Sequence, residues 1–180
     1  MEEKLRNIIT QHVQIGSQIW MTENLNTDRF RNGDIIQEAK TDKEWVMAGW
    51  EGKPAWCYYD NNPANGKKYG RLYNWYAVND QRGLAPEGWH IPTKAELETL
   101  ASSVGNNSNA LKAVGEGHGY YGGAGTNTTD FSALFAGYRY GSGYFYYLAN
   151  NTNYWSSTVY AATTAYNLNL YYNDTSITFH

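Results

Sequence analysis

Apolar and polar positions alternate near the beginning of the chain, on both sides of a glycine. Across residues 13–21, apolar residues alternate with glutamines around the pair Gly16-Ser17. Alternation with a period of two is typical of a half-buried strand, and a glycine-containing pair between two such runs is typical of a tight turn. The pattern therefore predicts a β-hairpin.

Two stretches farther along the chain have helical spacing, and a start signal precedes each. Residues 42–48 follow Thr41 and residues 94–103 follow Thr93, with a glutamate three residues after each threonine. In such a pair each side chain bonds the other residue's backbone N–H, which caps the first turn. We therefore predict two capped helices. The buried stripe of the second consists of Leu97, Leu100, Ala101 and Val104.

The region between these helices has a less regular pattern. Residues 60–66 are rich in Asn, Asp, Pro and Gly, which bond or fix the local backbone, so this cluster is predicted to be a turn. Residues 69–78 place Leu72, Trp75 and Tyr76 at helix-compatible spacing, so a helix is predicted there.

The last third of the chain has the pattern of short strands. It follows a glycine-rich stretch, 115–129, that is predicted to be irregular. The predicted strands are 131–140, 144–148, 154–160, 165–172 and 176–179. Helices early and antiparallel strands late predict an α+β fold, with two main helices and a short-stranded antiparallel sheet. A length of 180 residues is sufficient for a single domain, 1–180.

Charge and hydropathy argue against two classes of partner. A formal net charge of -3 offers no basic face for nucleic acid. The longest apolar runs contain only a few residues, far fewer than a membrane span needs, so we expect no membrane insertion. The N-terminus is charged and lacks an apolar stretch of signal-peptide length, so no signal peptide is predicted in this chain.

Candidate catalytic and metal-binding groups are sparse. The one cysteine, Cys57, has aromatic neighbours and is predicted to be a buried structural thiol. The four histidines lack zinc-ligand spacing, and motifs for nucleophilic catalysis or phosphate binding are absent. We therefore expect no enzymatic activity and no cofactor. Calcium is an alternative, because Asn and Asp oxygens cluster at 60–65 and 106–109, but turn formation explains those residues equally well.

Residues 121–180 have the most unusual composition. Apart from the C-terminal carboxylate, their only formal charges are Asp130, Arg139 and Asp174, and they hold 11 of the 17 tyrosines. Tyrosine among many Asn, Ser and Gly residues is typical of an antibody paratope, where the ring supplies a large contact area at little entropic cost. The near absence of Lys and Glu is unusual for exposed strands. The alternative interpretation is that the tyrosines only stabilise a sheet, because tyrosine favours strands, and have no role in binding.

Alternation within residues 165–171 assigns side chains to the two faces of a strand. Leu168 and Leu170 are predicted to face the core. Asn167, Asn169 and Tyr171 are then predicted to point outward together. This row is part of the predicted recognition surface.

Several motifs spread over the chain match one known family. They are residues 13–25 (VQIGSQIWMTENL), 57–65 (CYYDNNPAN), 69–78 (YGRLYNWYAV), 86–93 (PEGWHIPT), 131–134 (FSAL), 137–139 (GYR) and 154–158 (YWSST). With these motifs in order along nearly its whole length, the chain resembles the Fibrobacter succinogenes major paralogous domain family. The resemblance implies a C-type-lectin-like fold of the formylglycine-generating-enzyme-like subtype, found in surface proteins and in variable proteins of diversity-generating retroelements.

The resemblance also suggests how the chain is divided. Residues 1–12 would be an N-terminal extension, and residues 154–178 a candidate variable ligand-binding region, rewritten by adenine-directed mutagenesis in such retroelements. Residues 88–98 are similar to a segment of formylglycine-generating oxidases. Those enzymes work through two active-site cysteines and this chain has one, so oxidase activity is not expected.

These observations together predict a non-enzymatic, receptor-like or adhesin-like ligand-binding protein. Its expected location is extracellular, on a cell surface or on a phage particle, and its expected partner is a protein or glycan. Alternatives are a carbohydrate-binding domain and a passive structural module. The predicted ligand-binding residues are Tyr144, Tyr146, Tyr154, Trp155, Tyr160, Asn167, Asn169, Tyr171 and Asn173. Of these, Trp155 also suits a structural role.

Overall fold

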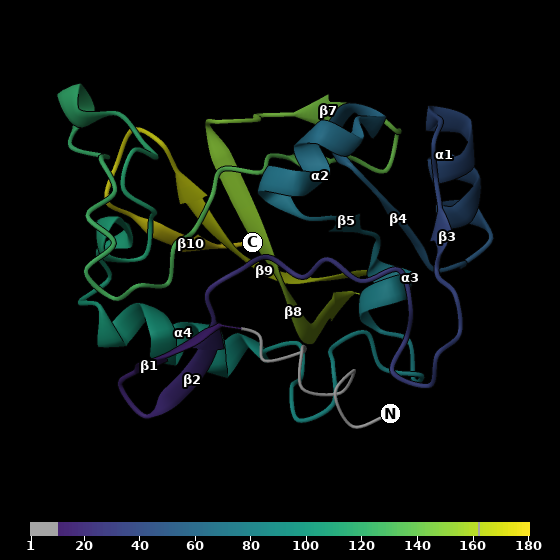
Figure 1. The fold of residues 1–180 in the computed structure, drawn as a ribbon, viewed down its shortest axis with the longest axis horizontal. Helices are drawn as coiled ribbons and strands as arrows, with labels where there is room; N and C mark the ends of the chain where they lie inside the picture. The colour runs from purple at the N-terminus through teal and green to yellow at the C-terminus, as the bar shows by residue number, and fades with distance from the viewer. Residues whose placement is uncertain (1–10, 162) are drawn as a thin grey trace.

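The structure, a computed structural model, describes residues 11–161 and 163–180. The predicted N-terminal extension, 1–12, therefore lies outside the described residues except for Gln11 and His12. The described part is a mixed α+β fold with small sheets and few helices, which confirms the predicted fold class at that level (Figure 1).

The helices are short, and α1 and α4 are the longest. They are α1 (Asp42–Trp50), α2 (Pro63–Tyr69), α3 (Trp75–Val78) and α4 (Lys94–Ser103), with the 3₁₀ turns η2 (Tyr59–Asn61), η3 (Ser108–Ala110) and η4 (Gly119–Tyr121). The strands are β1 (His12–Ile15), β2 (Gln18–Met21), β3 (Gln37–Glu38), β4 (Ala55–Cys57), β5 (Leu72–Tyr73), β6 (Tyr138–Arg139), β7 (Phe145–Tyr146), β8 (Asn151–Ala161), β9 (Thr164–Tyr171) and β10 (Ile177–Phe179).

These strands form four small sheets. Strands β1 and β2 make the predicted N-terminal hairpin, β6 and β7 make a second hairpin, and β10-β9-β8 form an antiparallel sheet. In the sheet β3-β4-β5 the first pair is parallel and the second antiparallel. Figure 1 shows the long β8–β9 ladder crossing the middle of the molecule, with α4 and the β1–β2 hairpin on one side and α2 and β7 on the other.

Both predicted capping boxes are present. The Thr41 hydroxyl accepts a hydrogen bond from the backbone N–H of Glu44, whose carboxylate accepts one from the Thr41 N–H at 2.9 Å. Thr93 and Glu96 make the same reciprocal pair at the start of α4. These two helices begin where the sequence predicts because their start signals involve only residues within one turn.

Two predictions in the middle of the chain were wrong. The polar cluster 60–66, predicted to be a turn, contains the first turn of α2, which the Asn62 side chain caps with Pro63 at the first helical position. The helix predicted over 69–78 exists only as α3. Its cap, Asn74, is buried, and its side-chain oxygen accepts from the N–H of both Ala77 and Ala55, so the helix cannot extend backward through Asn74.

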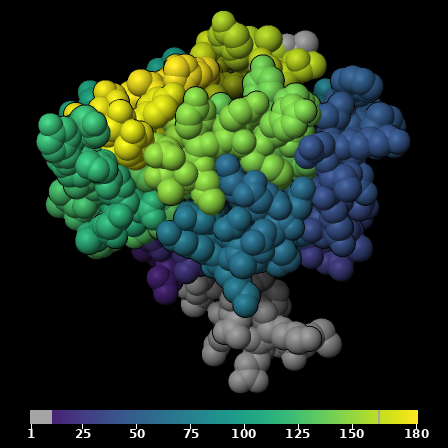
Figure 2. Space-filling model, turned by 90° about the horizontal axis from the view of Figure 1, so that it is seen from above, coloured from purple at the N-terminus to yellow at the C-terminus, as the bar shows by residue number. Residues whose placement is uncertain are grey.

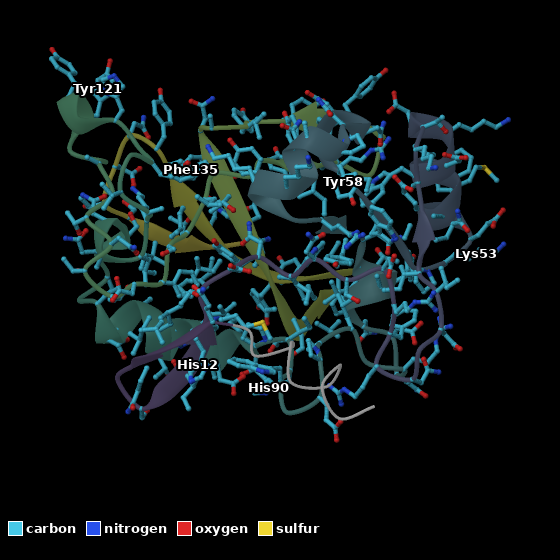
Figure 3. All side chains as sticks on the ribbon, viewed as in Figure 1. His12, Lys53, Tyr58, His90, Tyr121 and Phe135 are labelled. Carbon is cyan, nitrogen blue, oxygen red and sulfur yellow. The ribbon has the colours of Figure 1, made fainter. Side chains whose placement is uncertain are left out.

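Each of the five predicted tail segments contains a strand, with shifted ends. Between residues 131 and 140 only β6 is a strand, because Ser132 and Gly137 adopt left-handed backbone angles (φ 61° and 63°) that no extended strand contains. The glycine-rich stretch 115–129 is irregular apart from η4, as predicted. In Figure 3, Tyr121 of this turn points away from the body, whereas Phe135 is completely buried.

The largest hydrophobic cluster lies between α4 and the C-terminal sheet. Leu97 and Leu100 of α4 pack there with Leu168 and Leu170 of β9 and with Ile15 of β1. At roughly 25 cal/mol per Å² of apolar surface, fully burying each such side chain contributes about 2 kcal/mol. This cluster therefore holds the N-terminal hairpin, α4 and the β8–β9 ladder together.

Cys57 and Lys112 are buried in different ways. Burial raises the pKa of the Cys57 thiol to about 11, so it is a structural thiol as predicted. Lys112 has no exposed surface, and its ammonium donates to Asn109 Oδ1 at 3.1 Å and to the carbonyls of Gly123 (3.1 Å) and Asp174 (2.6 Å). Burial lowers the pKa of Lys112 to about 8, while Asp174 opposes this shift. The lysine ties the irregular stretch to the β9–β10 turn.

Candidate functional site

Strands β8 and β9 place the predicted Asn and Tyr residues on one face of the ladder. Trp155 lies opposite Asn167, Asn153 opposite Asn169, and Asn151 opposite Tyr171. Because side chains alternate along a strand, these six residues share a face and Leu168 and Leu170 occupy the other. The predicted grouping of residues 167, 169 and 171 is therefore confirmed.

The prediction that this row points outward was wrong. Asn169 is only 4% exposed, and Asn167 and Tyr171 are half-buried. A bridge joins Gly137 to Thr152 along the outer edge of β8, beside the β6–β7 hairpin. On β8 itself, Trp155 packs in a second cluster that includes Trp56 and donates its indole N–H to the Tyr73 carbonyl at 2.9 Å. The row is therefore largely shielded from solvent by other parts of the fold.

Three asparagine side chains on this face form a closed ring of hydrogen bonds. Asn151 Nδ2 donates to Asn169 Oδ1 at 2.7 Å, Asn169 Nδ2 donates to Asn153 Oδ1, and Asn153 Nδ2 donates to Asn151 Oδ1 at 2.9 Å. Asn151 and Asn169 are almost fully buried. A buried amide costs little free energy when it is bonded and about 1–3 kcal/mol when it loses its partner. We call this ring the asparagine triad.

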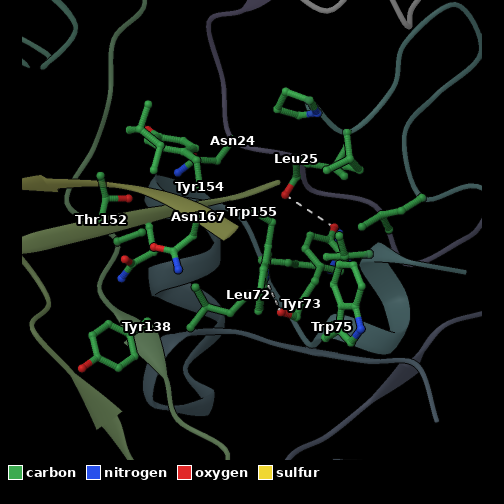
Figure 4. Close-up of a pocket in the computed structure, with 18 of the residues that line it drawn as sticks. Asn24, Leu25, Leu72, Tyr73, Trp75, Tyr138, Thr152, Tyr154, Trp155 and Asn167 are labelled. Atoms are coloured by element: carbon green, nitrogen blue, oxygen red, sulfur yellow. Dashed lines mark hydrogen bonds between the residues drawn. The ribbon is translucent and has the colours of Figure 1, made fainter. Parts of the chain in front are cut away.

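A hollow cavity of about 1620 Å³ extends along both faces of the ladder, with Asn167 and Trp155 lining it on one face and Leu168 and Tyr154 on the other. Figure 4 shows Trp155 and Asn167 projecting into it from the ladder, with Leu72 and Tyr73 of β5 opposite and Tyr138 to one side. The lining also includes exposed Tyr140 and Tyr147, so it reaches the molecular surface.

Four buried polar atoms of the cavity lining have no hydrogen-bond partner in the described part of the chain. They are Gln18 Oε1, Trp20 Nε1, Arg71 Nε and Asn167 Oδ1. Two of these atoms are donors and two are acceptors. A buried atom left without a partner costs about 1–3 kcal/mol, so such atoms are unusual in a folded protein.

A second Tyr-rich region lies on the surface. We call residues Tyr138, Tyr140, Tyr144, Tyr146 and Tyr147 the tyrosine face. All but Tyr138 are exposed, from 41% for Tyr146 to 62% for Tyr140. The ring centroids of Tyr138 lie 5.7 Å from Tyr146 and 5.9 Å from Tyr147. Figure 2 shows this segment, in bright green, in the middle of one side of the molecule, between α2 and the C-terminal residues.

The tyrosine face rests on a buried arginine. Arg139 donates to the carbonyls of Gly143 (2.8 Å) and Ala39 (3.0 Å) and to the Asp42 carboxylate (2.9 Å). Its guanidinium also lies over the Phe145 ring, 4.5 Å from the centroid. These contacts fasten the β6–β7 hairpin to α1 and to the segment before it, so the exposed tyrosines project from a fixed base.

The nine predicted ligand-binding residues are thus divided among separate places. Tyr144 and Tyr146 belong to the tyrosine face, whereas Tyr160 is exposed at the far end of β8, with its ring 5.2 Å from that of Tyr166. Tyr154 packs against Phe131, and its burial raises the pKa of its phenol. Trp155, Asn167, Asn169 and Tyr171 line the cavity. Asn173 is half-buried in the β9–β10 turn.

Residues at both places were missed by the sequence interpretation. Tyr138, Tyr140 and Tyr147 were not singled out, although the predicted strands 131–140 and 144–148, joined by Gly141-Ser142-Gly143, would bring them beside Tyr144 and Tyr146. The cavity residues Gln18, Trp20 and Arg71 come from distant segments. No local pattern could have grouped those three.

A sequence model of the Fibrobacter succinogenes major domain family matches residues 13–178. The chain belongs to the Fibrobacter succinogenes major domain family. The asparagine triad, the cavity residues named above and the tyrosine face all lie within the matched range. Searches of curated proteins and of solved structures found no match.

In this family member, the described residues include no group of three or more His, Cys, Asp or Glu side chains placed to hold a metal. Three of the asparagine oxygens considered for calcium have hydrogen-bond partners. Asn61 Oδ1 accepts from Arg139, Asn62 Oδ1 caps α2 and Asn107 Oδ1 accepts from the Asn109 N–H. No helix in the described ranges is both long and apolar enough to cross a membrane.

Proposed function

We propose that this chain is a non-enzymatic binding protein that recognises a macromolecular partner through the tyrosine face. The observation that supports this most is the exposure of four tyrosines within residues 138–147, where the one charged side chain, Arg139, is buried. Tyrosine combines a large apolar ring with a polar hydroxyl, so it contributes to interfaces at little cost in conformational entropy.

Two structural details support a role in binding over a merely stable hairpin. Tyr147 has a left-handed backbone angle, φ 62°, which is unfavourable for a bulky side chain. In this conformation its ring lies 6.2 Å from that of Tyr146 and 5.9 Å from that of Tyr138, so the three rings form a compact triangle. Backbone strain of this kind is concentrated at functional sites in proteins.

The finer assignments follow from the family resemblance and are part of the same proposal. They are a C-type-lectin-like fold of the formylglycine-generating-enzyme-like subtype, an extracellular, cell-surface or phage location, and diversification by a retroelement. If the gene is diversified, sequences from many isolates should vary at exposed Tyr144, Tyr146 and Tyr160 and keep Trp155 and Asn169. Variation spread evenly over exposed and buried positions would contradict diversification.

The proposed binding is tested with whole bacterial cells. The chain is biotinylated, tetramerised on streptavidin to raise its avidity, and incubated with a panel of bacterial strains, and bound fluorescence is measured by flow cytometry. We expect binding to a subset of strains. Replacing both Tyr144 and Tyr146 by serine should reduce this binding by about tenfold or more.

The matched control is Ile35→Ser. Ile35 is 66% exposed and lies outside the tyrosine face, so its replacement should leave binding unchanged. Binding to no strain, or an equal loss in the control, would overturn the proposal.

A further inference from the structure

We infer that three rings of the tyrosine face, those of Tyr138, Tyr146 and Tyr147, form a binding site for a quaternary ammonium group. This assignment rests on the proposed binding role of the tyrosine face, and it names the chemical group that the face recognises. The ligand is an organic cation whose nitrogen carries methyl groups in place of hydrogens, as in choline.

The three rings form a nearly equilateral triangle. Their centroids are 5.7, 5.9 and 6.2 Å apart, and their planes are tilted against one another by 35°, 37° and 38°. Three planes with such small mutual tilts have normals close to one direction, so the ring faces are turned the same way. A point above the centre of the triangle lies within about 6 Å of all three centroids, the range over which an aromatic face attracts a cation.

The backbone holds the rings in this arrangement. Tyr138 and Tyr146 are directly paired across the β6–β7 hairpin, so their side chains leave the same face of it. Tyr147 joins them through its left-handed backbone angle, φ 62°. Within the hairpin, buried Arg139 donates to the Gly143 carbonyl at 2.8 Å. The site is therefore largely formed before a ligand arrives, which lowers the entropic cost of binding.

The rings are accessible and uncharged. Tyr146 is 41% exposed and Tyr147 is 56% exposed, whereas Tyr138 is half-buried. Burial, followed by the neighbouring phenols of Tyr147 and Tyr171, raises the pKa of Tyr138, so its hydroxyl stays protonated at neutral pH. Attraction to a cation therefore comes from the ring faces and not from phenolates.

The charges of the hairpin favour a cation over an anion. Its one positive side chain, Arg139, is buried and lies 2.9 Å from the Asp42 carboxylate. The Asp42 side chain is 58% exposed, and Asp42 packs against Gly143 in the turn of the hairpin. The exposed charge at the turn is thus negative, which disfavours a phosphate or carboxylate ligand.

Ring faces discriminate among cations by their hydration. A lysine ammonium carries three N–H donors and is strongly hydrated, and the triangle offers it no carboxylate in exchange for that water. A quaternary ammonium has no N–H to satisfy, and its methyl groups contact the rings directly. The triangle therefore suits a quaternary ammonium better than an unmodified lysine.

The test is a titration of the full chain with choline chloride, with the ionic strength held constant by sodium chloride. Binding is followed by NMR of ¹³C-labelled tyrosine rings. The resonances of the three rings should shift in a saturable manner with a Kd of about 1–10 mM, as expected for a few exposed rings. The neutral isostere 3,3-dimethylbutan-1-ol has the shape of choline without its charge and should bind at least about fivefold more weakly.

Variants locate the site. Tyr147→Leu removes one ring and keeps apolar bulk, so it should weaken choline binding about two- to fivefold. Tyr144→Leu is the matched control, because Tyr144 is 61% exposed on the same hairpin but is not one of the three rings, and its affinity for choline should be unchanged. If Tyr147→Leu does not fold, Tyr146→Leu provides the same test with the same expected loss.

The source of the group is distinguished by two further ligands, titrated in the same way. Tighter binding of phosphocholine assigns the group to a lipid or cell-wall headgroup, and tighter binding of Nε-trimethyl-lysine assigns it to a methylated protein.

Equal binding of choline and its neutral isostere overturns the inference, and so does an unchanged affinity for choline in both ring variants. No saturable shift with choline overturns it as well. If binding to cells then still depends on Tyr144 and Tyr146, the proposed function stands without this site. Choline binding without binding to any strain would instead overturn the proposed function alone.

Discussion

The β8–β9 ladder and the tyrosine face are built from the same kinds of residue, but the protein uses them in opposite ways. Both are rich in tyrosine or asparagine and poor in charge. In the ladder, Asn151 and Asn169 are almost fully buried and bonded to each other, whereas Tyr140 and Tyr144 are more than half exposed. Composition therefore indicates that a segment is uncharged and adaptable. Neighbouring elements decide whether it is interior or surface.

The largest expected difference between the two regions is in their contribution to stability. Asn169→Leu should lower the free energy of unfolding by about 3 kcal/mol, because it leaves Asn151 Nδ2 and Asn153 Oδ1 without their partners. Tyr144→Ser on the tyrosine face should change it by less than about 0.5 kcal/mol. Urea denaturation of both variants measures the contrast, and equal effects would show that the triad is not a buried network.

A smaller, pH-dependent effect on stability is expected from Lys112, the buried lysine that bonds the β9–β10 turn. The pKa of Lys112 is about 8 in the folded protein and about 10.4 in an unfolded chain, so the unfolded state binds more protons between these values. The free energy of unfolding should therefore rise with pH, by about 1.5 kcal/mol between pH 8 and about pH 9.5. Below pH 8 this contribution should level off.

Lys112→Met is the control for this pH dependence. It removes the titrating group. At each pH, the difference between the free energies of unfolding of the two proteins, measured by urea denaturation, cancels the contributions of the tyrosines, which titrate in a similar pH range. Parallel pH profiles for the two proteins would mean that Lys112 keeps an ordinary pKa.

The smallest effect is expected within the tyrosine face. Tyr147→Gly should raise the free energy of unfolding by about 0.5 kcal/mol, because glycine tolerates φ 62° and this gain is partly offset by its larger entropy when unfolded. The same variant should weaken binding to cells, because it removes an exposed ring. Thermal denaturation and flow cytometry measure the two quantities. A drop in stability would show that the ring contacts of Tyr147 outweigh its backbone strain.

Local features of the fold were predictable from sequence and distant ones were not. The helix starts at Thr41 and Thr93 follow from residues within one turn, and the hairpin around Gly16 follows from alternation. Asn74 shows the opposite case. The helix predicted over 69–78 begins only after it, at Trp75, because the asparagine side chain also bonds Ala55, a residue of another strand that no local pattern connects to it.

The candidate site was predictable in the same limited way. Strand parity correctly grouped Asn167, Asn169 and Tyr171, because alternation is a property of one strand. Parity does not tell what lies over a face, and here the Tyr73 backbone lies against it and accepts a hydrogen bond from Trp155. The cavity itself combines side chains from segments far apart in the sequence, so only the folded chain brings them together.

The Arg139 anchor has a consequence for how the surface can change. Its partners are the carbonyls of Gly143 and Ala39 and the side chains of Asp42 and Asn61, none of them an exposed tyrosine. Replacing the displayed side chains therefore leaves the clamp itself intact. The hairpin is a suitable position for building libraries of new binders, in which residues 140, 144 and 146 are randomised while folding continues to depend on a guanidinium that the library never alters.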